Sequence, residues 1–137
     1  MAYMSQERKA AIAPTVKAVL KKYDLKGTLS VHNHSTLTLK IKSGRIDFIE
    51  NCNRVCGNDH YQVSRGFRKI TEGYCDVNPY WFKSHFDGEA RDCLAELLAA
   101  MNDGNHDNSD SSIDYFDVGW YTYIKIGNWD APYTVNV

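Results

Sequence analysis

Residues 104–133 read GNHDNSDSSIDYFDVGWYTYIKIGNWDAPY, and they combine a loop dense in Asp, Asn and Ser with the clearest strand pattern in the chain. Within it, residues 116–126 alternate between two sets of side chains, which is typical of a strand with one buried face. The alternation directs Trp120 and Ile124 toward a core and Tyr121 toward the opposite face. We therefore predict a strong strand here, preceded by a loop rich in Asp, Asn and Ser and followed by a turn.

Two other segments have the apolar spacing of an amphipathic helix. The first covers residues 5–23, where Ser5 is a suitable N-cap, and the second covers residues 87–102, where Asp87 is a suitable N-cap. Pro14 leaves two alternatives for the first segment, because proline removes an amide donor and clashes one turn back. Either the helix begins near this proline, or it is kinked there.

The remaining strand signals are shorter. Residues 28–41 alternate around a turn at 32–35 and predict a hairpin, and residues 45–49 and 69–77 predict two more strands. Residues 51–68 have no sustained periodicity, so we predict a loop there with at most one helical turn. A short edge strand is expected in residues 132–137. The order of elements predicts a single α+β domain over 1–137, with a mainly antiparallel sheet of about four to five strands and two helices packed on one face.

Composition and charge restrict the class of protein. The chain has 137 residues, 43% hydrophobic and 24% charged, and a net charge of -1. Residues 1–50 hold nine Lys and Arg against four Asp and Glu, whereas residues 101–137 hold one Lys against six Asp. A basic front half can attract phosphate groups or acidic proteins, although two solvated faces of opposite sign would give the same totals.

The chain contains neither an apolar run of about 20 residues nor the apolar core of a signal peptide. We therefore expect no membrane partner and a location in the cytoplasm of a bacterial host, where the four cysteines stay reduced.

The Asp-rich loop is the first candidate for chemistry. Asp103, Asn105, Asp107, Ser109 and Asp114 have the relative positions 1, 3, 5, 7 and 12 at which a calcium loop places its oxygen ligands. However, position 6 is Asn instead of Gly, and position 12 is Asp instead of Glu. A loop whose polar side chains cap their own backbone is the alternative. A divalent cation is the one cofactor that the sequence suggests, and none is otherwise expected.

Histidines and cysteines supply two further candidates. His32 and His34 flank Asn33 at the tip of the predicted hairpin, where they could hold a metal or act as a general base. No nucleophile lies beside them in the sequence, so solvated histidines in a turn are the alternative. Cys52 and Cys56, followed by a histidine at the same spacing, include metal-ligand residue types, but not the spacing of a zinc knuckle. Buried free thiols are the alternative there.

The binding surface predicted from the sequence combines aromatic and loop residues. Exposed aromatic side chains beside basic residues can stack on nucleic-acid bases, although they can also simply cover a half-exposed sheet. The chain has no phosphate-binding or dinucleotide-binding glycine motif, and no HExxH or GxSxG motif. Besides the hairpin tip, the candidate binding residues are Asn105, His106, Asp107, Asp110, Tyr121, Tyr123 and Trp129.

Three segments carry a family resemblance. They are SVHNHSTLTLKIKSGRIDFIENCN at residues 30–53, VNPYWF at residues 77–82, and the stretch quoted first. Together they resemble one of the large polyvalent protein-associated domains of phages and conjugative plasmids, over nearly the whole chain from residue 5 to residue 133. The resemblance implies an α+β domain in a mobile genetic element, acting early in the recipient cell on nucleic acid or against host defence. It supplies no catalytic residues.

The sequence thus leads to three hypotheses for function. The first is a non-enzymatic accessory protein of a phage or plasmid that binds nucleic acid or a host-defence component. The second is a small metal-dependent enzyme, or a calcium-binding or other divalent-cation module, built from the 103–114 loop and the His32 and His34 turn. The third is a structural homo-oligomer.

Overall fold

The computed structural model describes residues 3–105 and 119–136 of the chain. The described helices are α1 (Gln6–Lys22), α2 (Phe48–Gly57), α3 (His60–Ser64), α4 (Phe82–His85) and α5 (Gly88–Met101). The strands are β1 (Leu25–His32), β2 (Thr36–Gly44), β3 (Cys75–Val77), β4 (Tyr121–Ile126) and β5 (Thr134–Val135). The α+β class, the sheet of five strands and the helices predicted at both segments are confirmed.

The sheet is mixed rather than purely antiparallel. Its strand order is β1-β2-β4-β3, and β5 pairs with the end of β2. Strands β1 and β2 form the predicted antiparallel hairpin, and β3 pairs antiparallel with β4. The central pair, β2 with β4, is parallel, with Thr36 opposite Tyr121 and Ile41 opposite Ile126. The stretch quoted first therefore supplies a central strand, which covers 121–126 of the strand predicted at 116–126. Residues 116–118 of that prediction lie outside the described residues.

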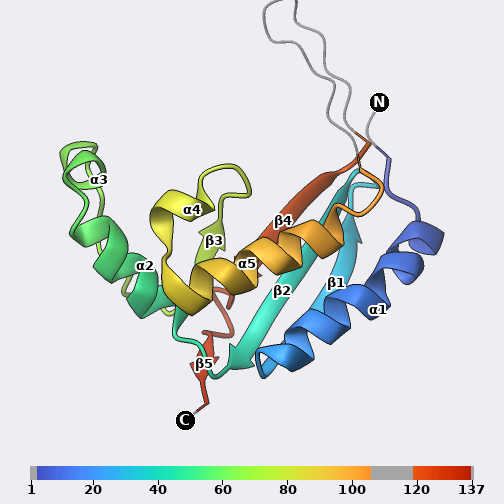
Figure 1. Cartoon of the computed structure of the whole chain (residues 1–137), viewed down its shortest axis with the longest axis horizontal. Coiled ribbons are helices and arrows are strands. Elements are labelled where there is room, and N and C mark those ends of the chain that lie inside the picture. The colour runs from blue at the N-terminus through green and yellow to red at the C-terminus, as the bar shows by residue number, and fades with distance from the viewer. Residues whose placement is uncertain (1–2, 106–118, 137) are drawn as a thin grey trace, which may run out of the picture.

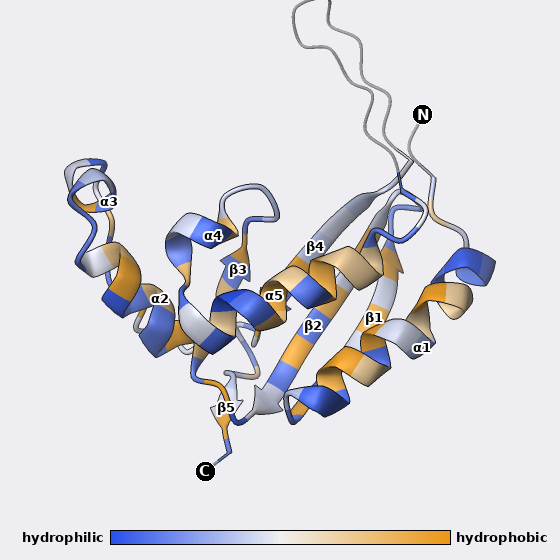
Figure 2. Ribbon diagram, in the orientation of Figure 1, coloured by the Kyte–Doolittle hydropathy of each residue, from blue (hydrophilic) through white to orange (hydrophobic). Residues whose placement is uncertain are grey.

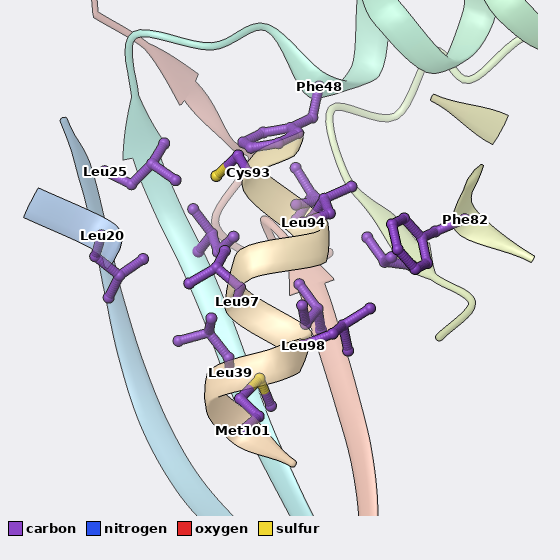
Figure 3. Packing of buried hydrophobic residues seen from close by; sticks show 14 of the residues in the cluster. Leu20, Leu25, Leu39, Phe48, Phe82, Cys93, Leu94, Leu97, Leu98 and Met101 are labelled. Atoms are coloured by element: carbon purple, nitrogen blue, oxygen red, sulfur yellow. The ribbon is translucent and has the colours of Figure 1, made fainter. Parts of the chain in front are cut away.

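The helices α1 and α5 lie on the same face of the sheet (Figure 1). Between them and the strands is one cluster of buried residues that includes the apolar stripes of both helices. Figure 3 shows Leu94, Leu97 and Met101 of α5 directed toward the core beside Leu39 of β2. At the end of α5, the indole Nε1 of Trp120 donates to the carbonyl oxygen of Met101 at 3.1 Å.

Helix α1 is continuous through its proline. It begins after Ser5, whose hydroxyl accepts from the amide of Arg8 at 3.0 Å, and it contains Pro14 on an exposed turn. The helix therefore does not begin at the proline. In β1, Gly27 lies at a bulge where a Cβ atom would come within 2.7 Å of the carbonyl oxygen of Lys40. Only glycine fits this close approach of two backbones.

The middle of the chain differs most from the prediction. The strand expected at 45–49 and the loop expected at 51–68 are wrong, because α2 begins at Phe48 and α3 follows it. The side chain of Asp47 accepts from the amide of Glu50 at 3.0 Å and starts the helix. Phe48, Cys52 and Cys56 then form a buried stripe at helical spacing. Of the strand expected at 69–77, only β3 is present.

Candidate functional site

The hairpin tip is exposed and tightly turned. His32, Asn33 and His34 are all exposed, and Asn33 and His34 have positive φ angles of 52° and 58°. The amide of Met4 donates to the carbonyl oxygen of His34 at 2.7 Å, and the amide of Tyr121 donates to that of Ser35 at 2.8 Å. These bonds join the tip to the N-terminal segment and to the start of β4.

Both described ends of the Asp-rich loop lie near this tip. The side chain of Asn105 donates to the carbonyl oxygen of Trp120 at 2.7 Å and accepts from its amide at 3.0 Å. Trp120 immediately precedes Tyr121, whose amide bonds to the hairpin turn. The side chain of Asn105 therefore ties the end of α5 to the start of β4, as a paired backbone would.

The proposed cation ligands are only partly within the described residues. Asp103 is exposed just after α5. His106, Asp107, Asp110 and Asp114 lie outside the described residues. Across residues 3–105 and 119–136, no group of three His, Cys, Asp or Glu side chains is arranged to hold a metal ion.

Cys52 and Cys56 are buried free thiols whose sulfur atoms lie 3.9 Å apart. Burial raises the pKa of both thiols. Metal binding requires the thiolate, so this environment opposes it. Helical spacing places both cysteines on the buried side of α2, whereas the sequence predicts an irregular region here.

One face of the sheet carries no described helix, and we call it the open face. Its residues alternate with core residues along each strand, as Figure 2 shows for β1 and β2. They are Lys26, Thr28, Ser30 and His32 of β1, Thr36, Thr38, Lys40 and Lys42 of β2, Tyr121, Tyr123 and Lys125 of β4, and Asp76 of β3. This face holds four lysines against one aspartate.

Register brings these side chains into rows across the strands. One row is His32, Thr36 and Tyr121, and the next contains Thr38 beside Tyr123. The predicted binding residues His32, Tyr121 and Tyr123 thus lie together. Trp129 is 76% exposed but follows the other end of β4, so it is separate from them.

The third row places two like charges side by side. Lys40 is directly paired with Lys125, and Asp76 lies beside Lys125 on β3. In the part of the chain that the structure describes, none of the lysines on the open face forms an ion pair. Like charges on paired positions destabilise a sheet. The row has one carboxylate, that of Asp76, against two lysines, so a further anion over the row would relieve the remaining repulsion.

Tyr123 is held in place within this surface. Burial, together with a hydrogen bond and the negative charge of Asp76, raises the pKa of Tyr123. The Nζ atom of Lys125 lies 6.0 Å from the centre of the Tyr123 ring. The neighbouring ring of Tyr121 is 45% exposed. The face therefore combines a fixed aromatic ring, an accessible one and unpaired positive charge.

The lysines of the open face were missed as site residues. The polar positions between the apolar ones in residues 28–41 were the available signal, together with the basic front half. What the sequence does not reveal is that β2 pairs with β4, since this pairing joins residues 85 positions apart, such as Thr36 and Tyr121.

Comparisons with models of protein families, with curated proteins and with solved structures find no match to this chain. No helix among the described residues is both long and apolar enough to cross a membrane.

Proposed function

We propose that the chain is a non-enzymatic protein that binds single-stranded nucleic acid across the open face of its sheet. In this proposal it acts as an accessory protein of a phage or plasmid, the setting that the sequence resemblance implies. The observation that carries the proposal is the placement of Tyr121 and Tyr123 on the central strand beside the paired Lys40 and Lys125.

The chemistry of this face suits a single strand. Exposed bases stack on aromatic side chains, and each stacked base contributes about 1–3 kcal/mol without strong sequence preference. Lysines neutralise the phosphates that follow the stacked bases. The threonine and serine hydroxyls between these groups can donate to phosphate or sugar oxygens. A duplex would offer no unstacked bases to the two tyrosines.

The test is binding of a fluorescein-labelled oligothymidylate of about 12 nucleotides, followed by anisotropy at salt concentrations from about 50 to 200 mM. Each phosphate neutralised on a single strand contributes about -0.7 to the log–log salt slope. The double variant K40Q/K125Q should therefore bind more weakly and have a slope shallower by about 1.4.

The matched control is K17Q/K83Q, which removes two exposed lysines from α1 and α4. It should leave the slope nearly unchanged, since neither lysine lies on the open face. Absence of binding at the lowest salt contradicts the proposal and favours a protein target, such as a host-defence component. Equal effects of the two double variants would show that binding depends on total charge and not on this face.

A further inference from the structure

Strand β1 lies at one edge of the described sheet, and it is long. It has eight residues and, among the described strands, pairs only with β2. Every second residue of an edge strand directs its backbone N–H and C=O groups away from the sheet. The opposite edge is β3, which has only three residues. The two edges therefore differ in how long a segment each could pair with.

A groove runs between this edge and helix α1. Its volume is about 410 Å³, its deepest lining residues are Val16, Leu20 and Leu39, and the small side chains of Ala10 and Ala13 form part of its helix wall. Leu29 of β1 is only half buried at its other wall. A hollow of about 540 Å³ shares Lys17 and Leu20 with this groove and extends it toward the start of β1.

The rim of the groove is basic. Lys9 and Lys17 line the groove itself, and Lys21 and Lys26 line the adjoining hollow. In the part of the chain that the structure describes, none of these lysines forms an ion pair. The rim has one acidic residue, Asp24. Its Oδ2 atom forms an ion pair with the Nε atom of Arg45 at 3.7 Å, so it does not neutralise the lysines. An apolar floor, a basic rim and an open strand edge thus occur together.

We propose that an extended acidic segment of a partner protein adds to β1 as a further strand. Its backbone continues the hydrogen bonds of the sheet, alternate apolar side chains enter the groove, and carboxylates that flank the paired residues reach the lysine rim. Strand addition of this kind takes affinity from backbone bonds and specificity from the pockets for alternate side chains. This surface is separate from the tyrosines and the Lys40–Lys125 pair proposed to bind nucleic acid.

Two other occupants fit less well. A second copy of the chain would bring one lysine rim against another, which repels. Nucleic acid has no peptide backbone with which to continue the hydrogen-bond ladder of the sheet. Lys26 and the bulge at Gly27 are common devices for protecting a strand edge. They affect only the start of β1, and residues 28–32 beyond them pair regularly with β2.

The test uses a labelled, end-capped peptide in which four valines alternate with threonines and two glutamates flank each end. We expect saturable binding, and slower amide exchange at residues 28–32 when the peptide is bound. A peptide of the same composition and with the same flanking glutamates, but with its four valines in one unbroken run, should bind at least about tenfold more weakly, because it cannot place all four valines in the groove. Equal affinity for the two peptides would show that binding depends on charge alone, and this result would overturn the proposal.

Variants of α1 locate the site. A13F fills the groove and should weaken binding of the alternating peptide by about tenfold or more, whereas A18F is the control, since Ala18 is exposed and does not line the groove. K9E/K17E changes only surface charge and provides a second test that does not depend on how A13F folds. Failure of the alternating peptide to bind, or binding that survives both A13F and K9E/K17E, overturns the proposal. None of these outcomes depends on binding of nucleic acid to the open face.

Discussion

The two faces of the central strands have the same backbone and opposite roles. On the helix-covered face, Leu37, Leu39 and Ile41 of β2 and Ile124 and Ile126 of β4 are all fully buried, with 0% exposure. The intervening residues of the same strands carry hydroxyls, lysines and tyrosines that are partly or fully exposed. The covered face is therefore optimised for packing.

The open face contains arrangements that packing does not explain. Two paired lysines cost stability, and an exposed tyrosine on a central strand gains little from burial. Such costs are expected where a surface is kept for binding. The alternation of one strand can therefore specify both the fold and the proposed interface. It also separates the two roles experimentally, because neighbouring residues can be changed one face at a time.

The largest expected effect is a loss of folding stability when the covered face is changed. The substitution L39A removes a fully buried side chain and should lower the free energy of unfolding by about 2–5 kcal/mol. Its neighbour T38A, on the open face, should lower it by less than about 1 kcal/mol. Urea denaturation of both variants measures the contrast. Similar losses for the two variants would contradict the assignment of the faces.

Next in size is the loss of stacking on the open face. Y121A should weaken binding of single-stranded DNA by about 1–3 kcal/mol, and Y121F should retain most of the affinity because the ring remains. W129A is the matched control, since Trp129 is more exposed but follows the far end of β4. Anisotropy titrations at one salt concentration compare the three variants. A larger loss of affinity in W129A than in Y121A would contradict the proposal, because it would place the interface at the far end of β4.

The smallest expected effect is in the helix layer that covers the other face. The hydroxyl of Tyr23, the C-cap residue of α1, donates to the carboxylate of Glu96 on α5. This hydrogen bond, burial and the negative charge of Glu96 raise the pKa of Tyr23 to about 12. An unperturbed tyrosine titrates near about pH 10. The neutral hydroxyl therefore contributes stability that is complete below about pH 10 and is lost as the pH rises to about 12.

The variant Y23F should be less stable than the natural chain by about 1 kcal/mol at neutral pH. This difference should shrink between pH 10 and pH 12, where denaturation curves of both proteins can be compared. Affinity for single-stranded DNA should be unchanged at neutral pH, because Tyr23 belongs to the covered side. A difference in stability that stays constant across this alkaline range would show that the hydrogen bond to Glu96 is not its source.

Local periodicity predicted the elements whose own sequence determines them. The apolar stripes ending in Tyr23 and Met101 indicated α1 and α5, and the alternation around Trp120 indicated both β4 and the direction of its tyrosines. The hairpin was also predicted from alternation on both sides of a polar turn. In each case the pattern repeats over enough residues to separate a period of two from a period of 3.6.

The features that the sequence did not predict depend on contacts between distant segments, or on sequence patterns of only a few residues. Ile46 and Phe48, with Asp47 between them, imitate a strand within residues 45–49, but the side chain of Asp47 caps a helix that begins at Phe48. The parallel pairing of β2 with β4 leaves no local mark, so the meeting of Lys40 with Lys125 could not be predicted. The candidate binding surface was therefore only half identified, through its tyrosines and His32.

The most direct test of the proposed interface is an NMR titration of the isotope-labelled protein with an oligothymidylate of about 12 nucleotides. The proposal predicts saturable shifts in the amides of β1, β2 and β4 and in the rings of Tyr121 and Tyr123, with the outer turns of α1 and α5 unchanged. Shifts confined to the helices, or no saturable shift at low salt, would contradict it.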